Sequence, residues 1–536
     1  MQKWKITCSD KRVSCLLQSW FFCQAIFFRR KSRRNPASLI LLNCIAWVLV
    51  ALMTPSVYAQ LSLYWIAGTD NWRFNNTSPN WRPYAEPTSI DYATINNGGV
   101  AIITDPGEAC NVLNVDVGTL QINSGSLSAS WEYVGYEFTG YVNHSGGTNT
   151  VSNQLLLGYT AWINPSTGTY NLSGSGQLYA PTEEIGVNYN GIFNQTGGTN
   201  TISNPSLGLL LAANPGSVGT YNLNGGTLIL GDLRKGNGTA AFNFGGGTMR
   251  ANNSFTSSLP ITLTGVNGNA TIDTNNRSIN LSGVISGSGG LRKIGPGTLT
   301  LSGNNTYTGG TTVVGFSDAY NRILAISAAN NLGPNSNPLR LIDNAILEYT
   351  GSTSTTLYNP INPANDFNGG FQIANPIVNL TVTSDIRSGI GGFGDFGKFG
   401  PGTLTLTGEI NNLGDWFHIN GIVNTSENVG VFNAYVGRDI FSGIATLNIG
   451  SDSTFAVGNQ IWSDVGGTIN VTNGGTLTTL DLACDGTINV LNNASLQVNG
   501  TSIIDGDGIL TLDTTGSVDL GSLTGNGRMT EVDPVV

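Results

Sequence analysis

The sequence predicts an all-β fold: a single-stranded parallel β-helix (a β-solenoid) with an aromatic-rich cap at its N-terminal end. Three observations support this prediction. Short β-prone runs recur at a regular spacing, and turns rich in Gly separate them; Gly accounts for 72 of the 536 residues. Charged residues make up only 10% of the chain, against 40% hydrophobic residues. No run is long enough to bury a core alone, so each unit must stack on its neighbours.

The clearest repeats lie in residues 119–290, where successive rungs read apolar–Asn–x–x–Gly. The Asn positions step by 28, 23, 28 and 21 residues, and two longer blocks each recur after 51 residues. A turn of this length accommodates three short strands and three corners, so 51 residues correspond to two turns. The rungs are Val142–Thr148, Tyr170–Gly174, Phe193–Thr199, Tyr221–Thr227 and Phe242–Thr248, with Leu120–Gly125 as an earlier member.

This spacing predicts how the side chains stack. Each strand pairs with the strand one turn above it at about 4.8 Å. The apolar residue before each Asn is expected to point inward, and the Asn side chains are expected to form a ladder of amides at a corner, where the Gly-Gly pair turns the chain. Residues 411–536 continue the pattern, with rungs at Leu447–Ile449, Ile469–Val471 and Ile488–Val490.

Residues 1–59 differ from the remainder and are predicted to be a signal peptide or extended leader. A basic cluster at Arg29–Arg34 precedes an apolar run at Leu39–Met53 and a small-residue site at Ser56–Ala59. This order is typical of a secretory signal, which predicts export and cleavage after Ala59. An uncleaved membrane anchor is the alternative, although the apolar run is short for a membrane span.

Charge also separates the leader from the rest of the chain. The leader holds nine of the 23 basic residues and one of the 33 acidic residues, which leaves a net charge of −18 after residue 59. Such a surface repels phosphate, so we expect no nucleic-acid partner. Cys110 and Cys484 remain after the leader, and their wide separation predicts neither a disulfide nor a zinc site.

Residues 60–118 are predicted to form the N-terminal cap and the first rungs. Trp65, Trp72 and Trp81 stand there among Pro and turn-forming residues. An aromatic cluster would cover the apolar cross-section and the unpaired strand edges that the first rung of a solenoid exposes. A platform on which sugars stack is the alternative interpretation of these three residues.

Residues 291–410 contain two related stretches. Ile294–Gly303 recurs as Phe399–Gly408 with the shared core G-P-G-T-L-T-L, and a Lys and a Gly-rich run precede each copy. The first copy continues as N-x-Y-x-G-G-T-x-V over Asn305–Val313, whereas the second departs from the pattern after Gly408. Between the copies, Ile323–Gly333 is expected to include a helical turn, and residues 359–371 are expected to project as a loop.

These motifs resemble the autotransporter-associated β-strand repeat found in the secreted passenger regions of bacterial surface proteins. The resemblance implies a right-handed parallel β-helix exposed outside the cell, and it implies no particular chemistry. Autotransporters finish with a membrane β-barrel. Here the rung pattern continues through residues 411–536, so we expect no β-barrel in this chain, and the export route stays open.

Groups able to carry chemistry are few, and we predict no catalytic, cofactor-binding or metal-binding residue. His144 stands at a variable rung position, and His418 has no partner motif. Paired carboxylates can cleave glycosidic bonds, and clustered acids can bind Ca²⁺. The closely spaced acids are expected to be solvated corner residues instead; they are Glu183 with Glu184, Asp481 with Asp485, and Asp505 with Asp507.

Aromatic residues outside the cap are candidates for stacking on glycans or for filling the core: Trp131 with Tyr133 and Tyr136, Trp162, Trp416 and Trp462. The sequence as a whole predicts a secreted or surface-exposed structural or adhesive β-helix without catalytic activity. The expected partner is an extracellular polysaccharide or a host or neighbouring cell surface, with membrane contact only through the leader or a missing barrel. The alternatives are a glycan-binding or polysaccharide-degrading (lyase or hydrolase) β-helix, and a passenger fragment of a larger autotransporter.

Overall fold

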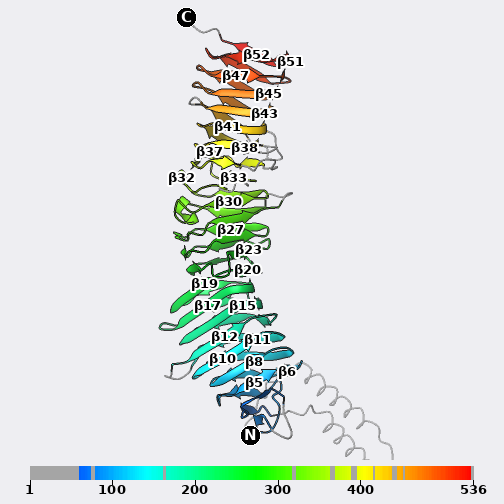
Figure 1. The fold of residues 1–536 in the computed structure, drawn as a ribbon, viewed down its shortest axis with the longest axis vertical. Helices are drawn as coiled ribbons and strands as arrows, with labels where there is room; N and C mark the ends of the chain where they lie inside the picture. Colours follow the sequence, from blue (N-terminus) through cyan, green and yellow to red (C-terminus); the bar gives the residue numbers. More distant parts are fainter. Residues whose placement is uncertain are drawn as a thin grey trace, which may run out of the picture. The chain divides into compact units, whose positions relative to one another are not determined.

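The computed structural model describes residues 59–532, except residues 74–78, 161–164, 317–320, 363–367, 388–394, 414–416, 438–443 and 451–452. The unit that begins at Leu61 is a column of parallel β-strands with about 18 turns (Figure 1), which confirms the predicted β-solenoid. The predicted leader and its alternative, a membrane anchor, concern residues that lie outside this range, apart from Ala59. Within the described residues, no helix has the length and apolar character to cross a membrane.

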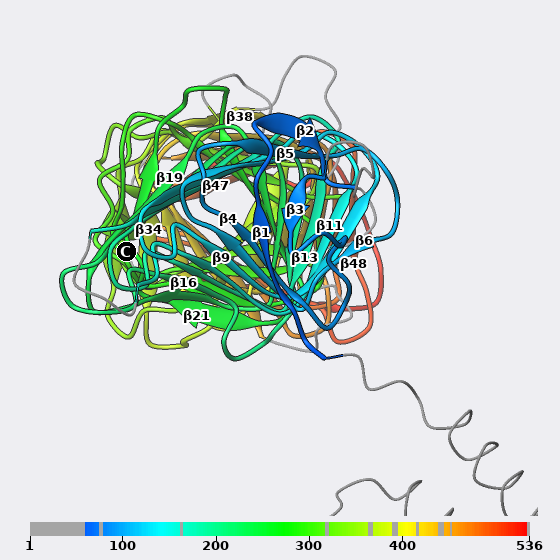
Figure 2. The same cartoon turned by 90° about the horizontal axis from the view of Figure 1, so that it is seen from below.

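Each turn contributes strands to three faces of the column, which are seen along its axis in Figure 2. Face 1 comprises β1 (Ser62–Trp65), β4 (Tyr92–Ile95), β7 (Val112–Val115), the second halves of β9 (Ser126–Val134) and β11 (Thr148–Leu157), β14 (Thr182–Ile185), β16 (Leu209–Leu211) and β18 (Leu233–Lys235).

Face 2 comprises β2 (Thr69–Asn71), β5 (Val100–Ile103), β8 (Gly118–Ile122), β10 (Thr139–His144), β12 (Thr167–Leu172), the first halves of β15 (Asn190–Ile202) and β17 (Val218–Leu230), and β19 (Thr239–Phe244). Face 3 comprises β6 (Glu108–Ala109), the remaining halves of β9, β11, β15 and β17, β13 (Gln177–Ala180), β20 (Thr248–Ala251), β23 (Ala270–Asp273), β26 (Leu291–Ile294) and β28 (Thr311–Val314).

The interior is a continuous hydrophobic core, because alternate residues of every strand point inward. The predicted column of apolar residues before each Asn is confirmed. Tyr170, Phe193, Tyr221 and Phe242 stack in successive turns with ring centroids 5.0, 4.7 and 5.4 Å apart and interplanar angles of 2°, 5° and 11°. Stability therefore comes from contacts between neighbouring turns rather than from one central cluster.

The predicted Asn ladder exists, but its placement at a corner is wrong. The Nδ2 atom of each Asn donates to the Oδ1 atom of the Asn one turn before it, over 2.7–2.8 Å. The buried residues before and after each Asn point inward, so the Asn itself faces outward; in β10, β12 and β19 it is the next-to-last strand residue and not part of the turn. The ladder runs through Asn143, Asn171, Asn194, Asn222 and Asn243.

A second Asn ladder lies in the C-terminal half on β40 (Gly421–Thr425), β42 (Ala445–Ile449), β44 (Gly467–Val471) and β46 (Thr487–Leu491). Its members are Asn424, Asn448, Asn470 and Asn489, again with Nδ2–Oδ1 distances of 2.7–2.8 Å. Both halves of the chain thus use the same outward-facing amide ladder.

The N-terminal cap is confirmed. The short strand β3 (Trp81–Arg82) pairs antiparallel with β1, and Trp65, Trp72 and Trp81 are all buried. The Trp81 ring packs edge-on against the other two, with centroid distances of 5.2 Å to Trp65 and 4.7 Å to Trp72. Because the rings are fully covered, they offer no face on which a sugar could stack.

The repeat region contains the predicted strands, β27 (Gly297–Leu301), β28 and β37 (Thr403–Leu406), and a 3-10 turn at η1 (Ala329–Leu332). Residues 323–326 of the expected helical stretch belong instead to β29 (Arg322–Ile326). Both ends of the loop expected at residues 359–371 belong to the column: Asn359 is buried, and Phe371 lies in β33 (Gly369–Ile373). Residues 363–367 of that loop lie outside the described residues.

Candidate functional site

The structure does not bring the predicted acids together. Glu183 is not a solvated corner residue: it lies in β14, points into the core and is fully buried. Asp481 holds the chain in place, because its Oδ1 atom accepts the backbone N–H of Thr501 at 2.8 Å. Within the described part of the chain, no group of three or more His, Cys, Asp or Glu residues could hold a metal ion.

The interior contains two polar networks that were not predicted from the sequence. Asn149 donates to Glu132 at 3.0 Å and to the Tyr170 hydroxyl at 3.3 Å, and all three side chains are buried. The same arrangement recurs 51 residues later, where Asn200 donates to Glu183 at 3.1 Å and to the Tyr221 hydroxyl at 3.2 Å. Burial raises the pKa of Glu132 to about 7 and that of Glu183 to about 8. The 51-residue repeat in the sequence could have revealed these networks. A shift of 51 residues places Glu, Asn and Tyr of the first network on Glu, Asn and Tyr of the second.

His144 belongs to the first network and has a structural role. Its Nε2 atom is 3.2 Å from the carbonyl of Gly147, so Nε2 carries the proton, and its Nδ1 atom accepts from the Tyr170 hydroxyl at 2.9 Å. Gln195 takes the same place 51 residues later: Oε1 accepts from Tyr221 at 2.7 Å and Nε2 donates to a backbone carbonyl at 2.9 Å. Burial lowers the pKa of His144, which keeps the imidazole neutral.

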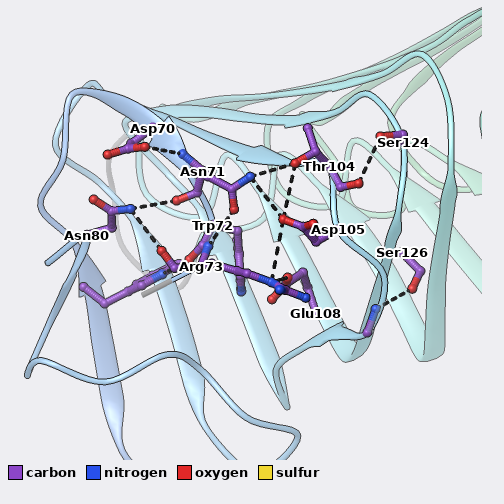
Figure 3. Close-up of polar contacts among 12 residues, drawn as sticks. Asp70, Asn71, Trp72, Arg73, Asn80, Thr104, Asp105, Glu108, Ser124 and Ser126 are labelled. Carbon is purple, nitrogen blue, oxygen red and sulfur yellow. Dashed lines mark hydrogen bonds and ion pairs between the residues drawn. The ribbon is translucent and has the colours of Figure 1, made fainter. Parts of the chain in front are cut away.

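A polar cluster at the cap joins the first two turns (Figure 3). The Nε atom of Arg73 lies 3.0 Å from Glu108 and 3.6 Å from Asp105, and Asn71 donates to Thr104 at 2.7 Å. The pKa of Glu108 is raised to about 7, chiefly by burial; the bond from Arg73 lowers it, and the carboxyl of Glu86 raises it. The Glu108 side chain is only 2% exposed, so a polysaccharide cannot reach its carboxyl, whereas the Asp105 side chain is 41% exposed.

Aromatic side chains gather on the outside of face 1. Trp131 and Tyr133 follow one another on the outer side of β9, with nearly parallel rings 6.4 Å apart. The Tyr133 ring also lies 5.5 Å from Tyr136 and 5.3 Å from Tyr159, and the Tyr136 and Tyr159 rings are 5.7 Å apart. We call Trp131, Tyr133, Tyr136 and Tyr159 the aromatic cluster; all four are half-buried.

The corner between faces 1 and 2 explains why two of these residues meet. Val134 and Leu157 pair in neighbouring turns, and each precedes a Gly with positive φ, Gly135 at 69° and Gly158 at 67°. A Cβ at either Gly would lie within 2.5 Å of backbone atoms of the next turn, so only Gly fits. Tyr136 and Tyr159 follow these glycines and therefore occupy equivalent positions one turn apart.

The other predicted aromatic candidates are distributed along the column. Trp462 stacks on Tyr435 at 4.3 Å, and Tyr435 stacks on His418 at 5.6 Å, in three neighbouring turns. Trp162 and Trp416 lie outside the described residues.

Comparison with known proteins assigns the repeat region. A family model described as the passenger-associated transport repeat matches residues 291–315 and 396–416, the two stretches that include β26–β28 and the consecutive strands β36 (Phe396–Phe399) and β37. These two stretches therefore resemble passenger-associated transport repeats, and both lie within the parallel β-helix. A segment of this chain is 31% identical over 189 residues to the Adhesin BmaC autotransporter of Brucella suis biovar 1 (strain 1330). That match covers 33% of this chain but only 5% of the adhesin. No solved structure matches the chain.

Both matched repeats contain a buried lysine. The Nζ atom of Lys293 donates to the Gly295 carbonyl at 2.8 Å and to the Thr274 hydroxyl at 2.9 Å. The Nζ atom of Lys398 donates to the carbonyls of Gly400 at 2.7 Å, Phe399 at 3.0 Å and Asn420 at 3.1 Å. Burial lowers the pKa of each lysine to about 7. The lysine thus satisfies the carbonyls that the Gly-Pro-Gly turn leaves without strand partners.

Proposed function

We propose that this parallel β-helix is displayed outside the cell as a non-catalytic, adhesive rod. The observation that carries the proposal is the stack of similar turns from β1 to β52 (Arg528–Glu531), each of which presents the same three faces to solvent. A repeated outer surface suits many weak contacts with one partner, whose combined strength exceeds that of each contact. The adhesin to which the chain is similar supports the adhesive role.

No specific observation favours the polysaccharide-degrading alternative. Glycoside cleavage needs two carboxylates on either side of a bound sugar. Glu183 and Glu108 are buried, and Asp481 accepts a hydrogen bond from a backbone N–H, so none of these three carboxyls is placed to act on a sugar.

The test is to locate a tagged full-length chain on intact cells. An epitope inserted between Val465 and Gly466 suits this purpose, because Val465 is 72% exposed and a Cβ at Gly466 would meet nothing within 4 Å. We expect antibody labelling of intact cells, release of a β-rich fragment by added protease, and stronger attachment than that of cells without the gene. Labelling only after permeabilisation would refute surface display, and unchanged attachment of labelled cells would refute the adhesive role.

A further inference from the structure

We propose that the aromatic cluster binds a neutral polysaccharide chain. The inference rests on the proposed function, because it names the ligand through which an adhesive rod would attach. It concerns one place on face 1, where Trp131 and Tyr133 on β9 meet Tyr136 and Tyr159 at the neighbouring corner.

The cluster is a local feature and not a consequence of the repeating fold. The corner positions that hold Tyr136 and Tyr159 are occupied by Val187 and Ala213 in the next two turns, after Gly186 and Ala212. The turns beyond therefore form the same corner without aromatic rings. Four half-buried rings are not needed to close the column at this level, so their presence calls for a different explanation.

The rings of Tyr133, Tyr136 and Tyr159 lie close together, and their hydroxyls have no hydrogen-bond partner among the described residues. Burial is the main cause that raises the pKa of Tyr133, and the neighbouring phenols of Tyr159, Tyr136 and Tyr92 raise it further. The pKa of Tyr136 is raised in the same way by burial and then by Tyr159. No hydrogen bond joins the hydroxyls of Tyr133, Tyr136 or Tyr159 to the part of the chain that the structure describes. These hydroxyls are therefore available to donate and accept hydrogen bonds.

The corner that carries Tyr136 is held rigidly. The Oδ1 atom of Asp116 accepts the backbone N–H groups of Glu137 at 2.8 Å and Phe138 at 2.6 Å. These two hydrogen bonds fix the backbone directly after Tyr136. A ring that is already in place loses little conformational freedom on binding, which favours affinity.

Aromatic faces beside free hydroxyls match the chemistry of a sugar. A pyranose ring presents apolar C–H groups on its faces and hydroxyls at its edge, so the rings of the cluster can cover the former and the phenol groups can bind the latter. The cluster has no charged side chain of its own, and the charged groups that raise the pKa of Tyr136 are the carboxyls of Glu137 and Asp116. The net charge of −18 after residue 59 repels acidic polysaccharides, which leaves a neutral chain as the ligand.

The experiment is affinity electrophoresis of the purified full chain in native gels that contain mannan, laminarin or hydroxyethylcellulose, with polygalacturonate as the acidic comparison. We expect retardation by at least one neutral polymer and none by polygalacturonate. Trp131→Ala and Tyr136→Ala should each weaken the binding about tenfold. Tyr136→Phe, which retains the ring and removes the hydroxyl, should give an intermediate loss.

Tyr141→Ala is the matched control, because Tyr141 is a 43% exposed aromatic residue on face 2, whereas Trp131 and Tyr133 lie on face 1. Its binding should equal that of the unmodified chain, and circular dichroism of every variant should show an intact β-structure. The proposal is overturned if none of the three neutral polymers retards the chain, if polygalacturonate does so equally, or if the cluster variants bind normally. Should cells carrying Tyr136→Ala still attach as before, the adhesive function would stand and the ligand site alone would fail.

Discussion

Inside the column, Asn149 donates a hydrogen bond of 3.0 Å to the carboxyl of Glu132, although 17 residues separate them. The same pair recurs as Asn200 and Glu183 at 3.1 Å, 51 residues later. Both carboxyls are fully buried, and within the described residues no cationic side chain contacts either, so burial favours the neutral acid. This relationship predicts an unusual dependence of stability on pH.

The free energy of unfolding should fall as the pH rises from about 4.5 towards neutrality. In the unfolded chain Glu183 titrates at its ordinary pKa of 4.5, whereas burial raises the pKa to about 8 in the folded chain. Between those values the folded chain retains a proton that the unfolded chain has lost, so this contribution is complete below 4.5 and is lost as the pH rises. Thermal unfolding of Glu183→Gln should show a weaker decline between pH 4.5 and 8. The control is Glu184→Gln, an outward-facing neighbour, and an identical pH slope in both variants would contradict the assignment.

Position 144 should accept Gln but not Leu. Gln195 shows that an amide can take the tyrosine hydroxyl proton and donate to a carbonyl as the imidazole of His144 does. His144→Gln should therefore unfold at nearly the same temperature as the unmodified chain. His144→Leu leaves the buried hydroxyl of Tyr170 without its acceptor, and we expect a loss of about 1–3 kcal/mol. Equal stability of the two variants in chemical denaturation would show that the hydrogen bond is unimportant.

The Asn ladder should be more sensitive in its middle than at its end. Asn222 takes part in two ladder bonds, to Asn194 and from Asn243, whereas Asn143 takes part in one. At about 0.5–1.5 kcal/mol for each bond, Asn222→Ala should destabilise the column roughly twice as much as Asn143→Ala. Hydrogen–deuterium exchange of face 2 amides measures the difference locally. If both variants exchange alike, the ladder adds little to the backbone pairing.

The buried lysines should be essential to their own turns. Lys398→Met removes three N–H donors and leaves the carbonyls of Phe399, Gly400 and Asn420 without them, which should cost about 2–4 kcal/mol. Faster amide exchange is expected in residues 396–425, while the N-terminal turns stay protected because turns contact only their neighbours. Lys235→Met, at an exposed position, is the control. Unchanged protection of residues 396–425 in Lys398→Met would rule out this role.

Much of the fold could be predicted from the amino-acid sequence. The rung motif, the aromatic column at Tyr170, Phe193 and Tyr221, the three-Trp cap and the strands of the repeats follow from local rules of turn residues and alternating burial. The error over the Asn ladder has a physical cause. The Asn-x-x-Gly pattern suggested a corner. The residues on both sides of the Asn, Val142 and His144 in the first rung, are buried, which places the Asn on the outer side of a strand.

The sequence by itself determined the repeating unit, its core residues and its stacking in a solenoid, because each of these depends on patterns within one turn. Only the tertiary structure decided which residues of different turns meet. Tyr136 joins Tyr159 across 23 residues, whereas Leu155 pairs with Glu183 across 28, because the corners differ in length from turn to turn. Register between turns follows from strand pairing, and a change of one residue would exchange the inner and outer faces. The interior carboxyls and the aromatic cluster could therefore be found only once the turns were stacked.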